Sequence, residues 1–363
     1  MMDEDLKFLV ALVSFPKFGA QSVSRLLASL GCAEAVWNAP ASALAQTGIR
    51  QAPIDEFVHF RSRTAPDALL EQHVKDGILM VRVGDDTYPA LLKEIHDPPQ
   101  LLFSRGTLPP KDALLLAVVG SRAGDRYAEE ALEHLLPPLV RAGVGIVSGL
   151  AMGCDGMAHR TTLAAGGTTH AVLASGLDWN HIGPRHHHAI AREMIGTGGS
   201  LLSELPRGTV AHKGHFPSRN RIISGLAKAT LVVEGTGDSG TRITARLAME
   251  QNRDVLVVPG SILSPLSALP HALLRQGATP VTCANDILEG LGCESEHVPT
   301  KPPPTPQNAN EAALLPLLSQ GPKQVDLLVR ESKLPAALVV QTLTELELRD
   351  AVKEIGGATY RLA

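Results

Sequence analysis

Aromatic residues, cysteines and long apolar runs are all scarce in this chain of 363 residues, of which only 3% are aromatic. No run approaches the roughly 18 apolar residues that a membrane-spanning helix requires. The N-terminus carries Asp3, Glu4 and Asp5 where a secretory signal peptide would carry positive charge. The 4 cysteines lie far apart without a CxxC pair, which argues against a zinc site or a disulfide framework. We therefore expect a soluble, cytoplasmic protein whose thiols are reduced.

Positive net charge is also lacking. The formal net charge is -4, so the chain does not coat nucleic acid by bulk charge as a histone does. Asp and Glu are absent, however, from residues 205–233, and this interval is locally basic. Its basic and histidine residues are Arg207, His212, Lys213, His215, Arg219, Arg221 and Lys228. The sequence thus predicts a basic loop that binds phosphate groups.

A glycine-rich loop follows the basic loop. The expected order is strand, loop, helix and strand, over residues 230–233, 235–240, 241–252 and 255–258. Unpaired backbone amides at the start of such a helix attract anions, and nearby hydroxyl groups can assist them. We therefore expect Ser239, Gly240 and Thr241 to contact phosphate.

This loop departs from the two common nucleotide-binding motifs. A Walker A loop ends in GK[ST], whereas Gly240 is followed by Thr241 and Arg242. The pattern GxGxxG matches a dinucleotide fingerprint. However, the next strand ends in Pro259-Gly260 and provides no Asp or Glu to bind the ribose hydroxyls. A dinucleotide site and a simple tight turn remain the alternatives to a phosphate-binding loop.

From Leu114 onward, strand patterns alternate with helical patterns of about 10–15 residues. This alternation predicts an α/β fold with a Rossmann-like, mostly parallel sheet and helices on both faces. Three loops that contain glycine end strands, at residues 120–122 (GSR), 148–153 (SGLAMG) and 235–240 (GTGDSG). Ligands bind such sheets at the carboxyl ends of the strands. Three loops on one rim suit a row of phosphates better than a single nucleotide.

The chain divides into four expected segments. They are a helical domain at 1–75, an extended Rossmann-like DNA-binding domain at 76–293, a proline-rich linker at 294–310 and a winged-helix domain at 311–363. The first is loosely similar to helix-hairpin-helix or SAM-like modules, with a purely structural role as the alternative. In the last, Glu345, Glu347 and Asp350 on the third helix would repel phosphate. Binding of duplex DNA and binding of protein stay equally open there.

Several ordered motifs carry a family resemblance. They are GSR at 120–122, SGLA with GCD at 148–155, LSE at 202–204, FPSRNRIIS at 216–224, SGTRITA at 239–245 and VPG at 258–260. Together they resemble the DprA (DNA-processing protein A, Smf) family over about residues 77–290. The resemblance implies a homodimer that binds single-stranded DNA in natural transformation and homologous recombination. It also implies protection of incoming strands and loading of the RecA recombinase, with no catalysis, no cofactor and no metal.

Carried over residue by residue, the resemblance implies that Arg122 clasps a phosphate, Ser121 adds a hydroxyl contact and Phe216 stacks on a base. The expected DNA-binding set is Gly120, Ser121, Arg122, Ser148, Gly149, Lys213, Phe216, Arg219, Asn220, Arg221, Ser239, Gly240 and Thr241. Two alternatives stay open. Arg219 or Arg221 could instead pair with Glu204 or Glu234, and Phe216 could belong to the core.

The sequence also departs from the family pattern. Gly183-Pro184 stands where a Tyr-Pro pair is common, and Asp238 stands where a lysine often precedes the SG motif. The usual Gly-x-Asn near the end of the sheet is replaced by residues 268–271 (ALPH). His271, Leu273 and Leu274 are the candidates for an apolar dimer interface.

An enzyme of a different class is the rival hypothesis. Lysine-decarboxylase-like nucleotide hydrolases share a Rossmann core, but their PGGxGTxxE signature is missing because Pro259-Gly260 is followed by Ser261. No Ser-His-Asp or paired-carboxylate arrangement is evident in the rim loops. Glu234 remains the candidate general base of such an enzyme.

Overall fold

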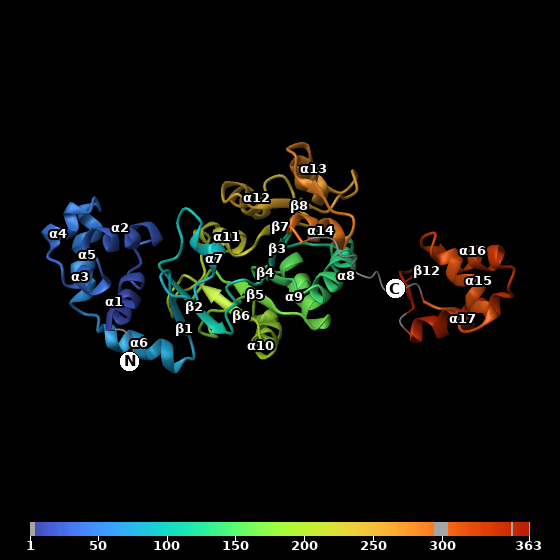
Figure 1. Cartoon of the computed structure of the whole chain (residues 1–363), viewed down its shortest axis with the longest axis horizontal. Helices are drawn as coiled ribbons and strands as arrows, with labels where there is room; N and C mark the ends of the chain where they lie inside the picture. Colours follow the sequence, from blue (N-terminus) through green and yellow to red (C-terminus); the bar gives the residue numbers. More distant parts are fainter. Residues whose placement is uncertain (1–3, 294–303, 350, 363) are drawn as a thin grey trace. The chain divides into compact units, whose positions relative to one another are not determined.

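The computed structural model describes residues 4–293, 304–349 and 351–362 (Figure 1). The chain forms two compact units, Met1–Glu296 and His297–Ala363, and each contains an apolar core of its own. Residues 294–303 of the predicted linker lie outside the described residues. No helix within the described ranges is long and apolar enough to cross a membrane.

The first unit begins with six helices. They are α1 Glu4–Val13, α2 Ala20–Leu30, α3 Ala33–Asn38, α4 Ala41–Gln46, α5 Gln51–Arg61 and α6 Pro66–Lys75. The predicted N-terminal helical region is confirmed. Pro66 starts α6 because a proline needs no amide hydrogen at the first helical position.

A sheet of nine strands follows. Its strands are β1 Leu79–Arg82, β2 Leu101–Gly106, β3 Leu115–Val119, β4 Gly145–Ser148, β5 Thr169–Val172, β6 Ser200–Ser203, β7 Ala229–Val232, β8 Asp254–Val257 and β9 Thr279–Pro280. The strand order is β1-β2-β6-β5-β4-β3-β7-β8-β9. Strands β3 to β9 pair in parallel, whereas β1 and β2 are antiparallel to their neighbours. The predicted Rossmann-like, mostly parallel sheet is confirmed.

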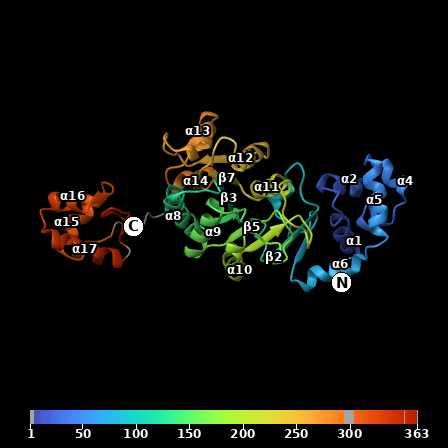
Figure 2. The same cartoon turned by 180° about the vertical axis from the view of Figure 1, so that it is seen from behind.

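Helices cover both faces of this sheet. Those between β1 and the end of the unit are α7 Ala90–Lys93, α8 Arg126–Arg141, α9 Cys154–Ala164, α10 His188–Gly196, α11 His215–Leu226, α12 Gly240–Glu250, α13 Ala268–Arg275 and α14 Ala284–Gly290. In Figures 1 and 2, α11 and α12 lie on the opposite side of the sheet from α9 and α10. Strand residues alternate between the two faces with period two. On β2, Leu102 joins the core beneath α11, while Leu101 and Phe103 join the core shared with the N-terminal helices.

The basic segment around the FPSRNR motif differs from its prediction. It was expected to be a loop, but residues from His215 onward form α11. Pro217 does not prevent this because it lies in the first turn, where amide hydrogens have no partner within the helix. The arginines of the motif therefore lie on a helix that packs against β3, β4 and β5.

The connections reverse direction between β3 and β7. The chain winds one way through β3, β4, β5 and β6, then crosses over through α11 to β7 and continues the other way to β8. Ligands of doubly wound sheets bind at such a switch point, beyond the carboxyl ends of the strands. The loops after β3 and β7 are therefore the first place to look for a site.

The second unit has the order of a winged helix. Its elements are α15 Ala309–Leu318, β10 Lys323–Gln324, α16 Val325–Ser332, α17 Ala336–Leu348, β11 Val352–Glu354 and β12 Thr359–Leu362. The three strands pair in the order β10-β12-β11. Leu314, Leu328 and Leu343 pack in the core between the three helices.

Candidate nucleic-acid interface

The loop after β3 is held closely by its neighbours. Cys154 donates its backbone amide to the carbonyl oxygen of Ser121, with an N···O distance of 3.1 Å. A Cβ atom at Gly120 would overlap the Cys154 sulfur, so this position requires glycine. On the other side, the amide of Asp125 donates to a carboxylate oxygen of Glu234, 3.4 Å away. The loops after β3, β4 and β7 thus meet at the switch point.

Arg122 and Phe216 form an accessible pair at this point. Arg122 is exposed, and its guanidinium carbon lies 4.9 Å from the ring centroid of Phe216. Phe216 is half-buried, so its alternative place in the core is not what the structure shows. A guanidinium and an aromatic ring side by side offer a phosphate contact and a stacking surface. The structure therefore brings together two residues that lie 94 positions apart in the sequence.

Arg219 is buried instead of exposed. Only 6% of the residue is accessible, and its guanidinium donates to the backbone carbonyls of Gly149 at 2.7 Å and Val172 at 2.5 Å. Burial lowers the pKa of Arg219 to about 10, and the nearby Asp155 carboxylate opposes this change. Arg219 was expected to bind DNA, but its guanidinium is buried and donates to the loop after β4 and to the end of β5.

The start of the loop after β4 is buried as well. Ser148 is fully buried, and its hydroxyl donates to the carbonyl of Val118 at 2.6 Å. A Cβ atom at Gly149 would overlap the guanidinium of Arg219. Ser148 and Gly149 were expected to bind DNA, but in this arrangement neither residue faces solvent. The Gly149 carbonyl instead accepts a hydrogen bond from the guanidinium of Arg219.

Arg221 is also committed to the protein. Its guanidinium pairs with Asp97 at 2.9 Å and with Glu204 at 2.5 Å, and the residue is 6% accessible. Arg221 was expected to bind DNA, and the alternative pairing with Glu204 is what the structure shows. A buried ion pair of this kind ties α11 to the end of β6 and to the segment before β2.

The loop after β7 keeps part of its expected accessibility. Gly240 starts α12 and is exposed, whereas Thr241 is 6% accessible. The Ser239 hydroxyl oxygen is buried without a hydrogen-bond partner among the described residues. The first turn of α12 thus presents amides that a phosphate could approach from the side of Gly240.

The remaining predicted residues lie at the start of α11. Lys213 is exposed, and Asn220 is half-buried one turn after Phe216. The imidazole rings of His212 and His215 lie 3.6 Å apart between centroids. Burial and the neighbouring His212 lower the pKa of His215. Lys213 forms no ion pair with the described residues, so it is available to a phosphate.

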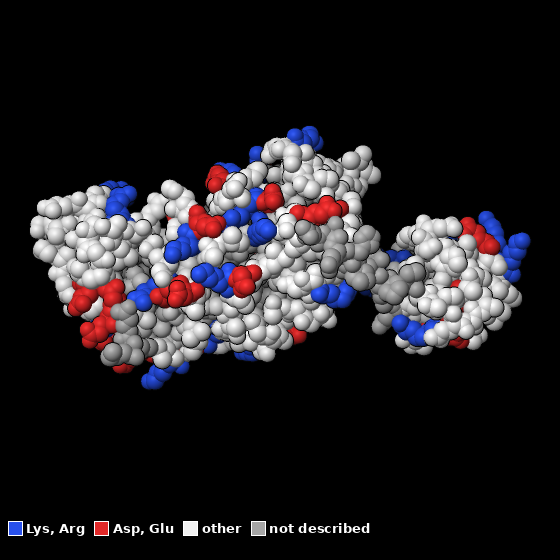
Figure 3. All heavy atoms as spheres, in the orientation of Figure 1, with Lys and Arg blue, Asp and Glu red and all other residues white. Residues whose placement is uncertain are grey.

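Charges of both signs mix on the face of the first unit shown in Figure 3. Lys and Arg side chains alternate there with Asp and Glu side chains, without one continuous basic area. A strand of nucleic acid would therefore find discrete contacts on this face. Their position matters more than the overall field of the protein.

Glu234 should make the free energy of unfolding depend on pH. Burial, followed by the nearby Asp125 carboxylate, raises the pKa of Glu234 to about 7. Between the ordinary pKa of a glutamate and this raised pKa, the folded state holds a proton that the unfolded state has lost. The free energy of unfolding should therefore fall as pH rises through this interval. Glu234→Gln should remove this part of the slope, measured by urea denaturation at mildly acidic and mildly alkaline pH.

A matched control is Glu129→Gln, which removes an exposed carboxylate from α8. This variant should keep the slope of the unchanged protein. Parallel profiles for Glu234→Gln and the unchanged protein would show that Glu234 is ionised throughout the interval.

The predicted dimer residues are mostly internal. Leu273 was expected in the dimer interface, but it is 4% accessible and belongs to the core beneath α12, so it offers little surface to a second copy. Leu274 is partly buried against the same core. A ring nitrogen of His271 lies 3.0 Å from the carbonyl oxygen of Gly260. Ile262 and Leu263, 87% and 88% accessible in the adjacent loop, are exposed apolar residues that the sequence pattern did not reveal.

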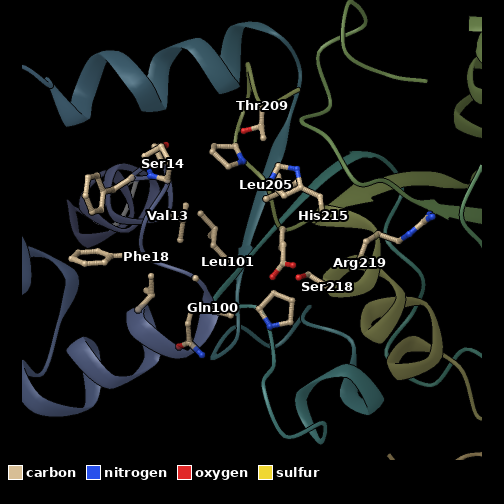
Figure 4. A pocket seen from close by; sticks show the side chains of 18 of the residues that line it. Val13, Ser14, Phe18, Gln100, Leu101, Leu205, Thr209, His215, Ser218 and Arg219 are labelled. Atoms are coloured by element: carbon tan, nitrogen blue, oxygen red, sulfur yellow. The ribbon is translucent and has the colours of Figure 1, made fainter. Parts of the chain in front are cut away.

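A wide cleft lies beside the start of α11. It has a volume of about 1260 Å³ and separates the N-terminal helices from the segment 204–219. In Figure 4, Val13, Ser14 and Phe18 lie on one wall, with His215 and Ser218 opposite. The guanidinium of Arg219 points away from this space. The cleft was not predicted, because its walls come from distant parts of the sequence.

The described residues contain no cluster of three or more His, Cys, Asp or Glu side chains arranged to hold a metal ion. The binding groups that the strand-end loops offer are amides, cations and an aromatic ring.

Comparisons with known proteins place the chain in a family. A model described as DNA recombination-mediator protein A matches residues 79–292, and one described as the DprA winged helix domain matches residues 298–358. The Smf protein of Escherichia coli strain K12 is 38% identical over 328 residues, which cover 88% of this chain and 86% of the relative. The chain belongs to the DprA/Smf family. The DprA protein of Bacillus subtilis strain 168 is 42% identical over 225 residues, or 61% of this chain and 74% of that protein.

Solved DprA structures share the fold. The X-ray structure of DprA from Streptococcus pneumoniae has a TM-score of 0.67 and 33% sequence identity, covering 78% of this chain and 97% of that one. DprA from Helicobacter pylori has a TM-score of 0.51 and 24% identity, covering 59% of this chain and 95% of that one. The H. pylori structure gives insight into a single-stranded DNA binding mode of that protein.

Proposed function

We propose that this protein binds single-stranded DNA along the rim where β3, β4 and β7 end. The observation that carries the proposal is the exposed Arg122 lying over the half-buried ring of Phe216, 4.9 Å from its centroid. Lys213 and the first turn of α12 supply further contacts for a backbone. Membership of the DprA/Smf family and the single-stranded DNA binding described for the H. pylori relative support it.

An unpaired strand fits these features better than a duplex. Aromatic stacking requires a base whose face is open, and a duplex hides that face between neighbouring base pairs. The rim has few free cations, because Arg219 and Arg221 are engaged with the protein. A combination of stacking and a few phosphate contacts is typical of proteins that bind single strands without sequence preference.

The family also suggests the biological setting. We propose a cytoplasmic homodimer that protects incoming strands in natural transformation and helps load the RecA recombinase, without catalytic turnover. Ile262 and Leu263, which are exposed in the loop after β8, extend the predicted dimer interface that includes His271 and Leu274.

Arg122→Ala tests the phosphate contact. It should weaken binding of all single strands about equally and reduce the slope of log affinity against log salt by about 0.7, because one phosphate contact on a single strand releases about that many counterions. The measurement is a fluorescence-anisotropy titration with a labelled oligothymidine at several salt concentrations.

Arg63→Ala is the matched control, because Arg63 is exposed in the turn between α5 and α6. It should leave both affinity and slope unchanged. An unaltered slope in Arg122→Ala would mean that Arg122 only supports the ring of Phe216.

A nucleotide-hydrolysing enzyme is the second candidate function. Glu234 favours it, since burial and Asp125 raise its pKa to about 7, which suits a general base at neutral pH. If the protein is only a binder, incubation with nucleoside monophosphates should release no free base, as followed by chromatography. Release that Glu234→Gln abolishes would establish the enzyme instead.

The winged helix is better suited to protein than to duplex DNA. Its third helix, α17, contains no Lys or Arg between Ala336 and Leu348. Leu338, Val340 and Leu348 are exposed on it, with accessibilities of 37%, 50% and 82%. Winged helices that read DNA place polar and basic side chains in the major groove. We propose that this surface contacts a protein partner.

A further inference from the structure

The first turn of α11 separates two surfaces. Phe216 lies on the side of Arg122, whereas His215 and Ser218 line the cleft shown in Figure 4. A strand bound on the rim therefore needs to pass only this turn to reach the cleft. The two surfaces are continuous through residues 212–219.

The cleft is large enough for several bases. Its volume of about 1260 Å³ exceeds the roughly 300–1,000 Å³ of pockets that hold one small molecule. Its opposite wall comes from the end of α1, the start of α2 and the residues before β2. A space of this size between two walls suits a short row of planar groups.

The walls combine apolar and neutral polar groups. Leu205 supplies accessible apolar surface, with Phe18 and Leu101 mostly buried behind the wall, while Gln21 and Thr209 supply an amide and a hydroxyl. The side chains of Gln21 and Thr209 have no hydrogen-bond partner among the described residues. Amides can donate and accept hydrogen bonds to the edges of bases.

The charged groups of the cleft are already paired. Arg207 forms an ion pair with Asp76 at 2.5 Å, and Arg221 is paired with Asp97 and Glu204. A phosphate entering here would meet carboxylates next to each of these guanidinium groups. The cleft therefore favours neutral groups over the backbone of a nucleic acid.

We infer that this cleft holds unstacked bases of the single strand whose backbone lies on the rim beside Arg122 and Phe216. The inference rests on the proposed function and adds the N-terminal helices to the binding site. In this arrangement, α11 supports the backbone on one side of its first turn, and the start of α2 contacts base edges on the other.

Photo-crosslinking tests the position of the bases. A single-stranded oligonucleotide carrying 4-thiothymidine should crosslink to residues 13–23 and 204–209, identified by mass spectrometry after digestion. Crosslinks to residues 119–126 and 235–242 without any to residues 13–23 or 204–209 would overturn the inference, because the strand would then stay on the rim.

A neutral double variant tests the energetic contribution. Gln21→Ala with Thr209→Val should weaken binding of oligothymidine roughly three- to tenfold, as expected for the loss of one or two hydrogen bonds. Binding of an abasic strand of equal length should not change, since its phosphates remain. Gln46→Ala, an exposed glutamine on α4 outside the cleft, should leave both affinities unchanged.

The outcomes separate the inference from the function on which it depends. If the double variant binds both strands equally weakly, or binds oligothymidine as well as the unchanged protein does, the cleft does not hold bases. Binding at the rim would still stand in either case. If the unchanged protein binds neither strand, the proposed function fails and the cleft inference fails with it.

Discussion

Arg219→Met is expected to lower the free energy of unfolding by about 3 kcal/mol, because two buried backbone carbonyls lose their donor at roughly 1–3 kcal/mol each. The variant leaves Asp155 without its cation and removes the donor from the carbonyls of Gly149 and Val172. Urea denaturation at neutral pH measures the change. Single-strand binding should fall as well, because the loop after β4 loses its support.

The control for Arg219→Met is Arg160→Met, which removes an equal charge from an exposed position on α9. It should change stability by no more than about 0.5 kcal/mol. A fully stable Arg219→Met protein with a smaller salt slope would restore Arg219 as a phosphate ligand.

Phe216→Ala should weaken binding of single-stranded DNA by about 1–3 kcal/mol, the range for losing one stacked base. The salt slope should stay nearly constant, because the ring carries no charge. Anisotropy titrations at two salt concentrations measure both quantities, and a thermal melt checks that the half-buried ring is not required for folding. Phe216→Tyr keeps the ring and should keep most of the affinity.

The contact between Arg122 and Phe216 adds a second expectation. The double variant Arg122→Ala, Phe216→Ala should lose less affinity than the sum of the single losses, since each residue positions the other. Strict additivity would show that the two side chains contact DNA independently.

Much of the architecture follows from the local pattern of the sequence. The apolar runs around β3, β7 and β8, separated by glycine loops and helical stretches, were sufficient to predict a wound, mostly parallel sheet. The pattern failed in the basic segment, which was expected to form a loop but is helical from His215 onward.

The accessibility of the basic residues could not be predicted. The local sequence does not tell Arg122, Arg219 and Arg221 apart. The carbonyl acceptors of the buried Arg219 lie 70 and 47 positions away in the sequence. Only the pairing of Arg221 with Glu204 was foreseeable, because these residues are 17 positions apart and of opposite charge. Burial of an ion depends on tertiary contacts, which a sequence pattern does not contain.

Leu101 and Phe103 have a consequence for how this protein can be divided. Both side chains leave the sheet on the face where Leu12, Leu26 and Phe57 of the opening helices are packed. A shortened chain starting at Asp76 would expose this apolar face of the sheet to water. Such a chain should aggregate or bind chaperones. The N-terminal helices therefore share a core with the sheet and cannot be removed as an independent domain.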